Sequence, residues 1–252
     1  MTPTTSRDAL RRLDGDEVHL WWARPPGITA PATLDRCRQL LTREERDRVA
    51  RFRFDADRHT ALITRALVRR ALSRYDDVPP EVWRFRAGAH GRPEIAEPAS
   101  PLCFNLSHTR GLVVCLVGRR REVGVDVEAI RTGRPWLELA SRFFAPAEAT
   151  ALRRLDAGEQ PGRFLEYWTL KEAYVKARGL GVTIPLAQLA FELPAAAGSP
   201  VRVRFEPALG DDPLRWQFSV RRFGADHVLA TVVERTGTAG AEILQHDATS
   251  LL

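Results

Sequence analysis

Two spacings of apolar residues divide this chain into predicted strands and helices. Positions two apart share one face of a strand, whereas positions three and four apart share one face of a helix. By this criterion the first half begins with a strand, continues with three helices and ends with short strands. The predicted strands cover residues 18–22, 82–86, 103–106 and 112–117, and the helices cover residues 31–41, 42–52 and 57–73. Thr42 and Glu45 have the spacing of a capping box, which predicts that a helix begins at this threonine.

The second half repeats this order of elements. It begins with a strand over residues 123–127, in which valines occupy alternate positions. Helices are predicted over residues 136–143, 146–155 and 163–178, and strands over residues 189–193, 201–205, 215–223 and 227–234. Because the order occurs twice, we predict an α+β protein of two similar halves, residues 1–121 and 122–236. Residues 237–252, rich in Gly, Ala and Thr, are predicted to be a mobile tail.

The composition is that of an ordinary globular protein. The chain has 252 residues, of which 44% are hydrophobic and 28% are charged. No run approaches the roughly 20 apolar residues that cross a membrane, and the first twenty residues lack the apolar core of a secretory signal. Three cysteines without disulfide-like or metal-like spacing, Cys37, Cys103 and Cys115, favour a reducing compartment. We therefore expect a cytoplasmic protein without membrane association.

The charge pattern points to an anionic partner. A net charge of +6 favours a nucleotide, a nucleic acid or an acidic protein. Only two of the 38 basic residues are lysines, Lys171 and Lys176, and they lie five residues apart. The compact charge of a lysine suits contact with a crowded phosphate oxygen better than the planar fork of an arginine does. Chance survival of two lysines in an arginine-biased chain explains the pattern equally well.

Carboxylates on neighbouring elements suggest a cation site. Asp126 and Glu128 share one face of their predicted strand, opposite the valines and about 7 Å apart. Such a pair can be the solvent face of an edge strand, but the flanking valines favour a buried strand, where two carboxylates require a cation or basic partners. A helical spacing of four places Trp168, Glu172 and Lys176 together, so Glu172 is a candidate third ligand. Three carboxylates suit Mg²⁺ that bridges a pyrophosphate, although Glu172 and Lys176 could also form a simple ion pair.

Residues 104–111 are predicted to form a polar loop between apolar strands. Within it, Ser107, His108 and Thr109 could bind phosphate oxygens through hydroxyl, imidazole and backbone N–H groups. Adjacent serine and histidine residues are also common in ordinary turns. The chain lacks the Gly-x-Ser-x-Gly elbow of many serine hydrolases, so we reject a hydrolase of that kind.

Four stretches together carry a resemblance to a known family. They are Gly-Arg-Pro at residues 91–93, Phe-Asn-Leu-Ser-His at 104–108, Gly-Val-Asp-Val-Glu at 124–128 and Trp-Thr-Leu-Lys-Glu-Ala-Tyr-Val-Lys at 168–176. In order and spacing, roughly residues 15–235 resemble the 4′-phosphopantetheinyl transferases. The resemblance is closer to the larger, monomeric class that serves peptide and polyketide synthases. It implies two α+β halves related by a pseudo-twofold axis, with coenzyme A in the cleft between them.

The resemblance also implies roles for individual residues. Asp126, Glu128 and Glu172 match the Mg²⁺ ligands of the family, and His108 and Lys176 match its pyrophosphate contacts, with Ser107 beside them. Arg48 and the turn of Gly91, Arg92 and Pro93 match the region that holds the 3′-phosphate and adenosine. Glu148 matches a glutamate proposed as the base for the attacking serine. The chain departs from the pattern at Glu45, where some members carry a basic phosphate contact, and at Arg92, which replaces the usual lysine. The second departure should be tolerated, because an arginine fork binds a terminal phosphate well.

The activity implied is Mg²⁺-dependent transfer of the 4′-phosphopantetheine arm of coenzyme A to a serine of an acyl or peptidyl carrier domain, with release of adenosine 3′,5′-bisphosphate. Trp136, Leu137 and Phe143 are either a surface for the carrier or core residues. Lys171 points about 100° away from Glu172 on an ideal helix, and its role stays open. Two alternatives are a non-catalytic scaffold that binds coenzyme A and an arginine-rich nucleic-acid-binding protein. The second is disfavoured because the arginines form no basic block and no aromatic platform accompanies them.

Overall fold

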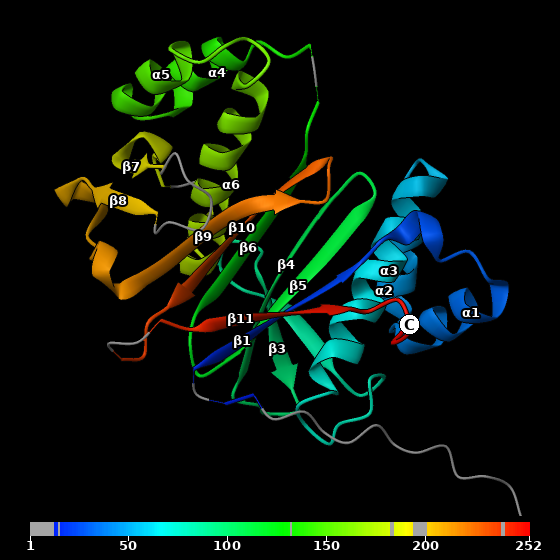
Figure 1. Ribbon diagram of the computed structural model, residues 1–252. Coiled ribbons are helices and arrows are strands. Elements are labelled where there is room, and N and C mark those ends of the chain that lie inside the picture. Colours follow the sequence, from blue (N-terminus) through cyan, green and yellow to red (C-terminus); the bar gives the residue numbers. More distant parts are fainter. Residues whose placement is uncertain (1–12, 15, 132, 182–183, 194–200, 238–239) are drawn as a thin grey trace, which may run out of the picture.

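The computed structural model describes residues 13–14, 16–131, 133–181, 184–193, 201–237 and 240–252, and its two halves contain their elements in the same order (Figure 1). The first half contains β1 (Glu17–Ala23), α1 (Pro31–Leu40), α2 (Arg43–Ala50), α3 (Asp55–Leu72), β2 (Arg84–Ala87), β3 (Pro93–Glu97), β4 (Leu102–Thr109) and β5 (Leu112–Arg119). The second contains β6 (Val123–Ala129), α4 (Trp136–Phe143), α5 (Pro146–Arg153), α6 (Gln160–Arg178), β7 (Leu189–Glu192), β8 (Arg202–Phe205), β9 (Trp216–Phe223) and β10 (His227–Glu234).

The pairing of the strands is repeated as well. The order is β1-β5-β4 in the first half and β6-β10-β9 in the second, and these neighbours are antiparallel. Each half adds a separate antiparallel pair, β2 with β3 and β7 with β8. The predicted α+β fold of two similar halves is therefore confirmed. The capping box at Thr42 and Glu45 is also present, since each side chain accepts a hydrogen bond from the backbone N–H of the other.

Two predictions about local structure were wrong. Ser107, His108 and Thr109 do not lie in a loop, because β4 continues to Thr109 and pairs with β5 over its whole length. The tail expected over residues 237–252 contains a further strand, β11 (Glu242–Asp247), which pairs in parallel with β1. Ala248 and Leu252, just beyond β11, are buried in the core of the first half. The backbone of β1 thus supplies hydrogen-bond partners for β11, and the composition of the tail gave no sign of this pairing. Residues 238–239 lie outside the described part of the chain.

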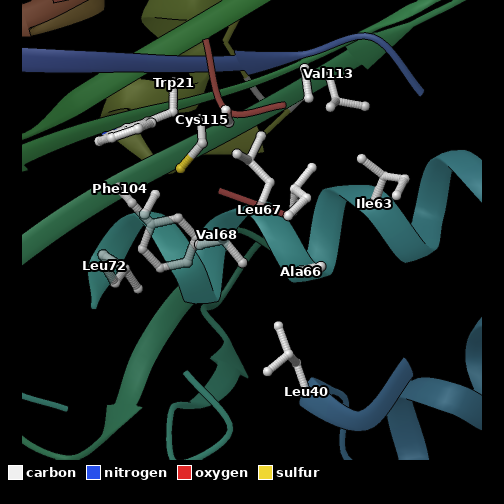
Figure 2. Close-up of a cluster of buried hydrophobic side chains, with 14 of the residues drawn as sticks. Trp21, Leu40, Ile63, Ala66, Leu67, Val68, Leu72, Phe104, Val113 and Cys115 are labelled. Atoms are coloured by element: carbon white, nitrogen blue, oxygen red, sulfur yellow. The ribbon is translucent and has the colours of Figure 1, made fainter. Parts of the chain in front are cut away.

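The long helices α3 and α6 cover one face of each sheet, and they lie on different sides of the molecule (Figure 1). Figure 2 shows Ile63 and Leu67 of α3 on the side of the helix that faces Val113 and Cys115 of the sheet, and all four belong to one buried cluster. In α6 the predicted apolar stripe is buried, namely Phe164, Tyr167, Leu170, Tyr174 and Ala177. Of the helices that the structure describes, none has the length and apolar character needed to span a membrane.

The opposite faces of the two sheets pack against each other. A shared apolar cluster takes Val18, Leu20, Leu112, Val114 and Leu116 from the first half and Val123, Val125, Val127, Leu229 and Val233 from the second. The alternate valines of β6 therefore face the first half, as the strand spacing predicted. Positions 124, 126 and 128 face the other way, toward α6.

Gly124 lets α6 pack directly on β6. A Cβ atom at this glycine would lie 1.9 Å from the carbonyl oxygen of Ala173 and 2.7 Å from the backbone nitrogen of Ala177. Both are backbone atoms of α6, so a larger residue would have to move the helix. The lack of a side chain at Gly124 thus sets the distance between β6 and α6, and Asp126 of β6 lies close to Lys176 of α6 for this reason.

We expect Gly124→Ala to lower the free energy of unfolding by about 1–3 kcal/mol, as overpacking usually does, or by more because backbone must shift. Denaturant unfolding followed by circular dichroism measures the change. Gly162→Ala is the matched control, since the nearest atoms to its Cβ would be the guanidinium end of Arg222, an exposed side chain that can move. Equal losses of stability in both variants would contradict a rigid contact at Gly124.

Candidate functional site

The two halves meet where the edge strands β4 and β6 lie side by side. Side chains at alternate positions of β4 accept hydrogen bonds from backbone N–H groups of β6. The pairs are Asn105 Oδ1 with Val125 N at 3.0 Å, Ser107 Oγ with Val127 N at 3.3 Å, and Thr109 Oγ1 with Ala129 N at 3.2 Å. This side-chain ladder satisfies backbone donors of β6 that would otherwise be buried without partners. It also fixes Ser107 next to Asp126.

Asp126, Ser107 and Lys176 form the centre of the site. Lys176 Nζ lies 2.6 Å from Asp126 Oδ1 and donates to Ser107 Oγ at 3.0 Å and to the carbonyl oxygen of Val125 at 3.3 Å. Ser107 Oγ in turn donates to Asp126 Oδ1 at 2.8 Å. Lys176 and Ser107 thus contact the same carboxylate oxygen of Asp126. The other, Asp126 Oδ2, is buried and has no hydrogen-bond partner, as an oxygen reserved for a cation would be.

Glu128 and Glu172 surround this centre with further negative charge. Burial raises the pKa of the Glu128 carboxyl, and the charge of Asp126 raises it further. Burial likewise raises the pKa of Glu172, followed by the charges of Asp126 and Glu128, while Lys176 opposes the shift. A cation bound here would relieve this repulsion, and three carboxylates are suitable ligands for a hard divalent ion. Within the described residues, however, no three acidic, histidine or cysteine side chains are already gathered as a metal site.

Positive charge approaches the centre from the first half. Burial lowers the pKa of His108, and the charges of Lys176 and Arg65 lower it further. The pKa of Arg65 is itself lowered by burial, and the charge of Arg48 adds to this effect while Glu45 opposes it. Arg65 was missed in the sequence, because no motif surrounds it and it lies inside an otherwise ordinary amphipathic helix. The lowered pKa favours a neutral His108, which can still donate a hydrogen bond, while Arg65 and Arg48 bring positive charge. The region beside Lys176 is therefore suitable for phosphate groups.

Cavities lie on several sides of the centre. One of about 250 Å³ lies between the turn of Gly91, Arg92 and Pro93 and the face of α6 that carries Glu172 and Lys176. A second, of about 180 Å³, lies between Glu128 and a group of aromatic side chains, Trp136, Phe143, Phe164 and Trp168. A third, of about 1210 Å³, is lined by His108 and Thr109 and by residues of α2 and the start of α3. An extended ligand could therefore pass from the turn, by Lys176, to the aromatic group.

Arg92 already has partners in this structure. One of its guanidinium nitrogens lies 2.6 Å from Glu122 and donates to the carbonyl oxygen of Ala177 at 2.8 Å. The second contact is near the C-terminal end of α6, where a positive charge is favourable. Arg92 thus joins the Gly-Arg-Pro turn of the first half to α6 of the second. A phosphate bound by Arg92 would have to compete with Glu122.

Glu148 lies in the core of the second half, and its side chain is only 1% exposed. One oxygen accepts a hydrogen bond from the backbone of Phe191, and the other accepts one from Ala145 and lies 2.8 Å from Lys171 Nζ. The carboxylate is therefore not placed to take a proton from a serine of another protein. This geometry contradicts the prediction that Glu148 is the general base. Glu128 and Glu172 are the glutamates beside the centre.

Trp136, Leu137 and Phe143, which could be either a surface for the carrier or core residues, differ in burial. Trp136 is 7% exposed and belongs to the core of the second half. Leu137 and Phe143 are only partly buried and pack on the margin of that core. Arg142, an exposed residue of α4, holds its guanidinium 5.2 Å from the centre of the Phe143 ring. The surface of α4 therefore combines partly apolar and positive side chains.

Comparisons with known proteins agree on one family. Residues 29–120 match the model described as "4′-phosphopantetheinyl transferase, N-terminal", and residues 122–232 match that of the 4′-phosphopantetheinyl transferase superfamily. The 4′-phosphopantetheinyl transferase HetI of Nostoc is 37% identical over 68% of this chain and 72% of its own length. A phosphopantetheinyl transferase of Thraustochytrium is 32% identical over 88% and 81% of the two chains. The transferase Sfp of Bacillus subtilis is 31% identical over 63% and 69%.

The raised pKa of Glu172 predicts a pH-dependent gain of stability in Glu172→Gln. Because folding raises this pKa, ionised Glu172 destabilises the folded state once the pH exceeds the ordinary pKa of glutamate, about 4.3. We therefore expect the variant to melt at a higher temperature than the parent at pH 8. Near pH ~3, where both folded and unfolded carboxyls are protonated, the difference should vanish. Thermal unfolding at both pH values, with the exposed Glu138→Gln as control, tests this; an equal shift at both would contradict it.

Proposed function

Because this chain belongs to the 4′-phosphopantetheinyl transferase superfamily, we propose that it transfers the 4′-phosphopantetheine arm of coenzyme A to a serine hydroxyl of acyl or peptidyl carrier domains. We propose that this transfer depends on Mg²⁺. Adenosine 3′,5′-bisphosphate is the other product. The observation that carries the proposal is the contact between Lys176 and Asp126, with a free carboxylate oxygen beside it. It lies between two cavities that an extended ligand could join.

Asp126, Glu128 and Glu172 would hold the metal ion. The unpartnered Asp126 Oδ2 supports this set. The raised pKa values of both glutamates, caused first by burial and then by the charge of Asp126, also support it, because a bound cation would offset both effects. When bound, Mg²⁺ would offset the charge of the pyrophosphate and favour departure of the bisphosphate. Binding would also compete with Lys176 for Asp126, which leaves the ammonium group free to contact a phosphate oxygen.

The remaining residues would bind and orient coenzyme A. Lys176 and His108 would contact the pyrophosphate, with Ser107 beside them, and the turn of Gly91, Arg92 and Pro93 would contact the adenosine end together with Arg48. In the transfer, the serine oxygen forms a bond to the phosphorus that carries the pantetheine arm. The bond from this phosphorus to the bisphosphate breaks. The serine proton would pass to a carboxylate that lines a cavity, Glu128 or Glu172, because Glu148 is buried against Lys171.

The carrier would approach along α4, because this helix borders the cavity that Glu128 shares with the aromatic group. Leu137 and Phe143 would supply the apolar contact, and Arg142 would face the acidic surface typical of carrier domains. The net charge of +6 supports this encounter. We further propose that the protein acts as a cytoplasmic monomer on synthases that make polyketides or nonribosomal peptides. Neither a nucleic acid nor a membrane is needed as a partner.

Incubation with coenzyme A, Mg²⁺ and a panel of apo carrier domains tests the reaction. We expect each accepted carrier to gain the mass of one phosphopantetheine group in intact-protein mass spectrometry. Removal of divalent ions with EDTA should stop the gain, and added Mg²⁺ should restore it. Coenzyme A binding without a mass gain on any carrier would instead indicate a scaffold, and undiminished transfer in EDTA would refute the metal dependence.

Asp126→Asn should lower the rate of transfer by about 10²–10³-fold, the usual effect of removing a group that organises charge at a reacting centre. The variant keeps the shape of the side chain, so circular dichroism and thermal unfolding should report an intact fold. Asp47→Asn, an exposed position on α2, is the control. Retention of most activity by the Asp126 variant would show that the metal ligands are assigned wrongly.

A further inference from the structure

A buried ion pair of the same construction occurs in each half. In the second half, Glu148 is the third residue of α5 and accepts a hydrogen bond from the backbone of Ala145, which precedes the helix. The same carboxylate lies 2.8 Å from Lys171 of α6. Lys171 Nζ also donates to the carbonyl oxygens of Leu186 and Leu189, and it lies 5.5 Å from the ring centre of Phe191. The pair thus connects α5, α6 and the start of β7.

In the first half, Glu45 is the third residue of α2 and accepts a hydrogen bond from Thr42 at 2.9 Å. It lies 2.6 Å from Arg69 of α3. Arg69 donates to the carbonyl oxygens of Leu40 at 2.9 Å and Trp83 at 3.3 Å, and its guanidinium lies 4.8 Å from the ring centre of Phe85 in β2. Glu45 and Arg69 therefore connect α2, α3 and the start of β2. In the same way, Glu148 and Lys171 connect α5, α6 and the start of β7.

This repetition bears on what Glu148 does. Both cations are fully buried, and both glutamates combine a helix cap with an ion pair. Glu45 makes these contacts in a half that contributes none of the three carboxylates of the site. The arrangement therefore needs no catalytic role to explain it. It also explains why the chain departs from the family pattern by carrying an acidic residue at Glu45, since this carboxylate neutralises the buried Arg69.

In the second half the pair acts on the helix that carries the site. Lys171 and Glu172 are adjacent in α6 and project about 100° apart. Contacts of Lys171 with α5 and with the carbonyl groups of Leu186 and Leu189 fix the rotation of α6 about its axis. The contact at Gly124 fixes the distance of α6 from β6. A rotation of α6 would carry Glu172 and Lys176 away from Asp126.

We propose that Glu148 and Lys171 are positioning residues for the transfer reaction: their buried pair holds α6 so that Glu172 and Lys176 face Asp126, and Glu148 exchanges no proton with substrate. This inference rests on the proposed function for its kinetic part only. Its structural part, that the two charges are needed as a pair, can be measured without activity.

The test compares the single variants Lys171→Met and Glu148→Gln with the double variant. Removal of Lys171 alone leaves a buried carboxylate without its cation, which is strongly destabilising, whereas loss of both charges is often nearly neutral. We expect Lys171→Met to lower both the melting temperature and kcat, the latter by about tenfold or more on folded protein, since small misplacement of reacting groups has large effects. The double variant should recover the melting temperature and return kcat to within about threefold of the parent.

Arg69→Met supplies the matched control, because it removes the equivalent cation from the first half. It should lower the melting temperature like Lys171→Met but leave kcat of the folded protein nearly unchanged. Equal kcat losses in these two variants, or full kcat in Lys171→Met, would refute a positioning role specific to α6. The kinetics are measured well below each melting temperature, so the folded fractions are equal.

The pH dependence of kcat separates positioning from proton transfer. If Glu148 were the base, Glu148→Gln and the double variant would both lose about 10²–10⁴-fold in kcat, together with any acid limb that the parent profile shows. That result would overturn the proposal. The positioning role predicts that the double variant keeps the profile of the parent. Should the parent transfer nothing to any carrier, the proposed function fails, while recovery of the melting temperature in the double variant still tests the pair.

Discussion

The fold depends on the way in which two edge strands, β4 and β6, share hydrogen bonds without forming a common sheet. The backbone donors of β6 at alternate positions are satisfied by side chains of β4, from Asn105, Ser107 and Thr109. A buried edge without such partners would be costly, so the residues of β4 that face β6 must be short and polar. The same requirement places a hydroxyl group beside Asp126. The joint between the halves and the centre of the site are therefore built from the same residues.

The electrostatics of the site follow from this joint. Asp126 is held in a buried position by Ser107, and Lys176 supplies its nearest positive charge. Burial raises the pKa of Glu128 and of Glu172, the charge of Asp126 raises both further, and the single ammonium group of Lys176 only partly opposes these shifts. Asp126 Oδ2 is buried without a hydrogen-bond partner. The folded chain thus maintains a concentration of negative charge next to a group of cations from the first half. Such separation is suited to a bound cation on one side and phosphate groups on the other.

Sequence periodicity was a reliable guide where structure is local and a poor one where it depends on distant partners. The order of elements, the capping box at Thr42 and the face of β6 that carries Asp126 all follow from spacing along the chain. The end of β4 was predicted as a loop because its alternating polar residues face another strand and not solvent. The strand β11 was missed because its partner, β1, lies at the other end of the sequence. The resemblance gave Glu148 a role in proton transfer, since a motif does not show that Lys171 of another helix lies against it.

The hydrogen bonds of Lys171 and Lys176 give a physical reason for a lysine at each of these two positions. Lys171 and Lys176 each have three oxygen partners, which matches the three N–H donors of an ammonium group. An arginine would bring five donors into the same space. In the first half Arg69 occupies the position equivalent to Lys171, and one of its terminal nitrogens is buried without a hydrogen-bond partner. Its counterpart in α6 avoids that defect, as does Lys176 beside the carboxylates. Both lysines therefore use all three ammonium donors, Lys171 in full burial and Lys176 with a side chain that is 29% exposed, and both lie on the helix that contributes Glu172.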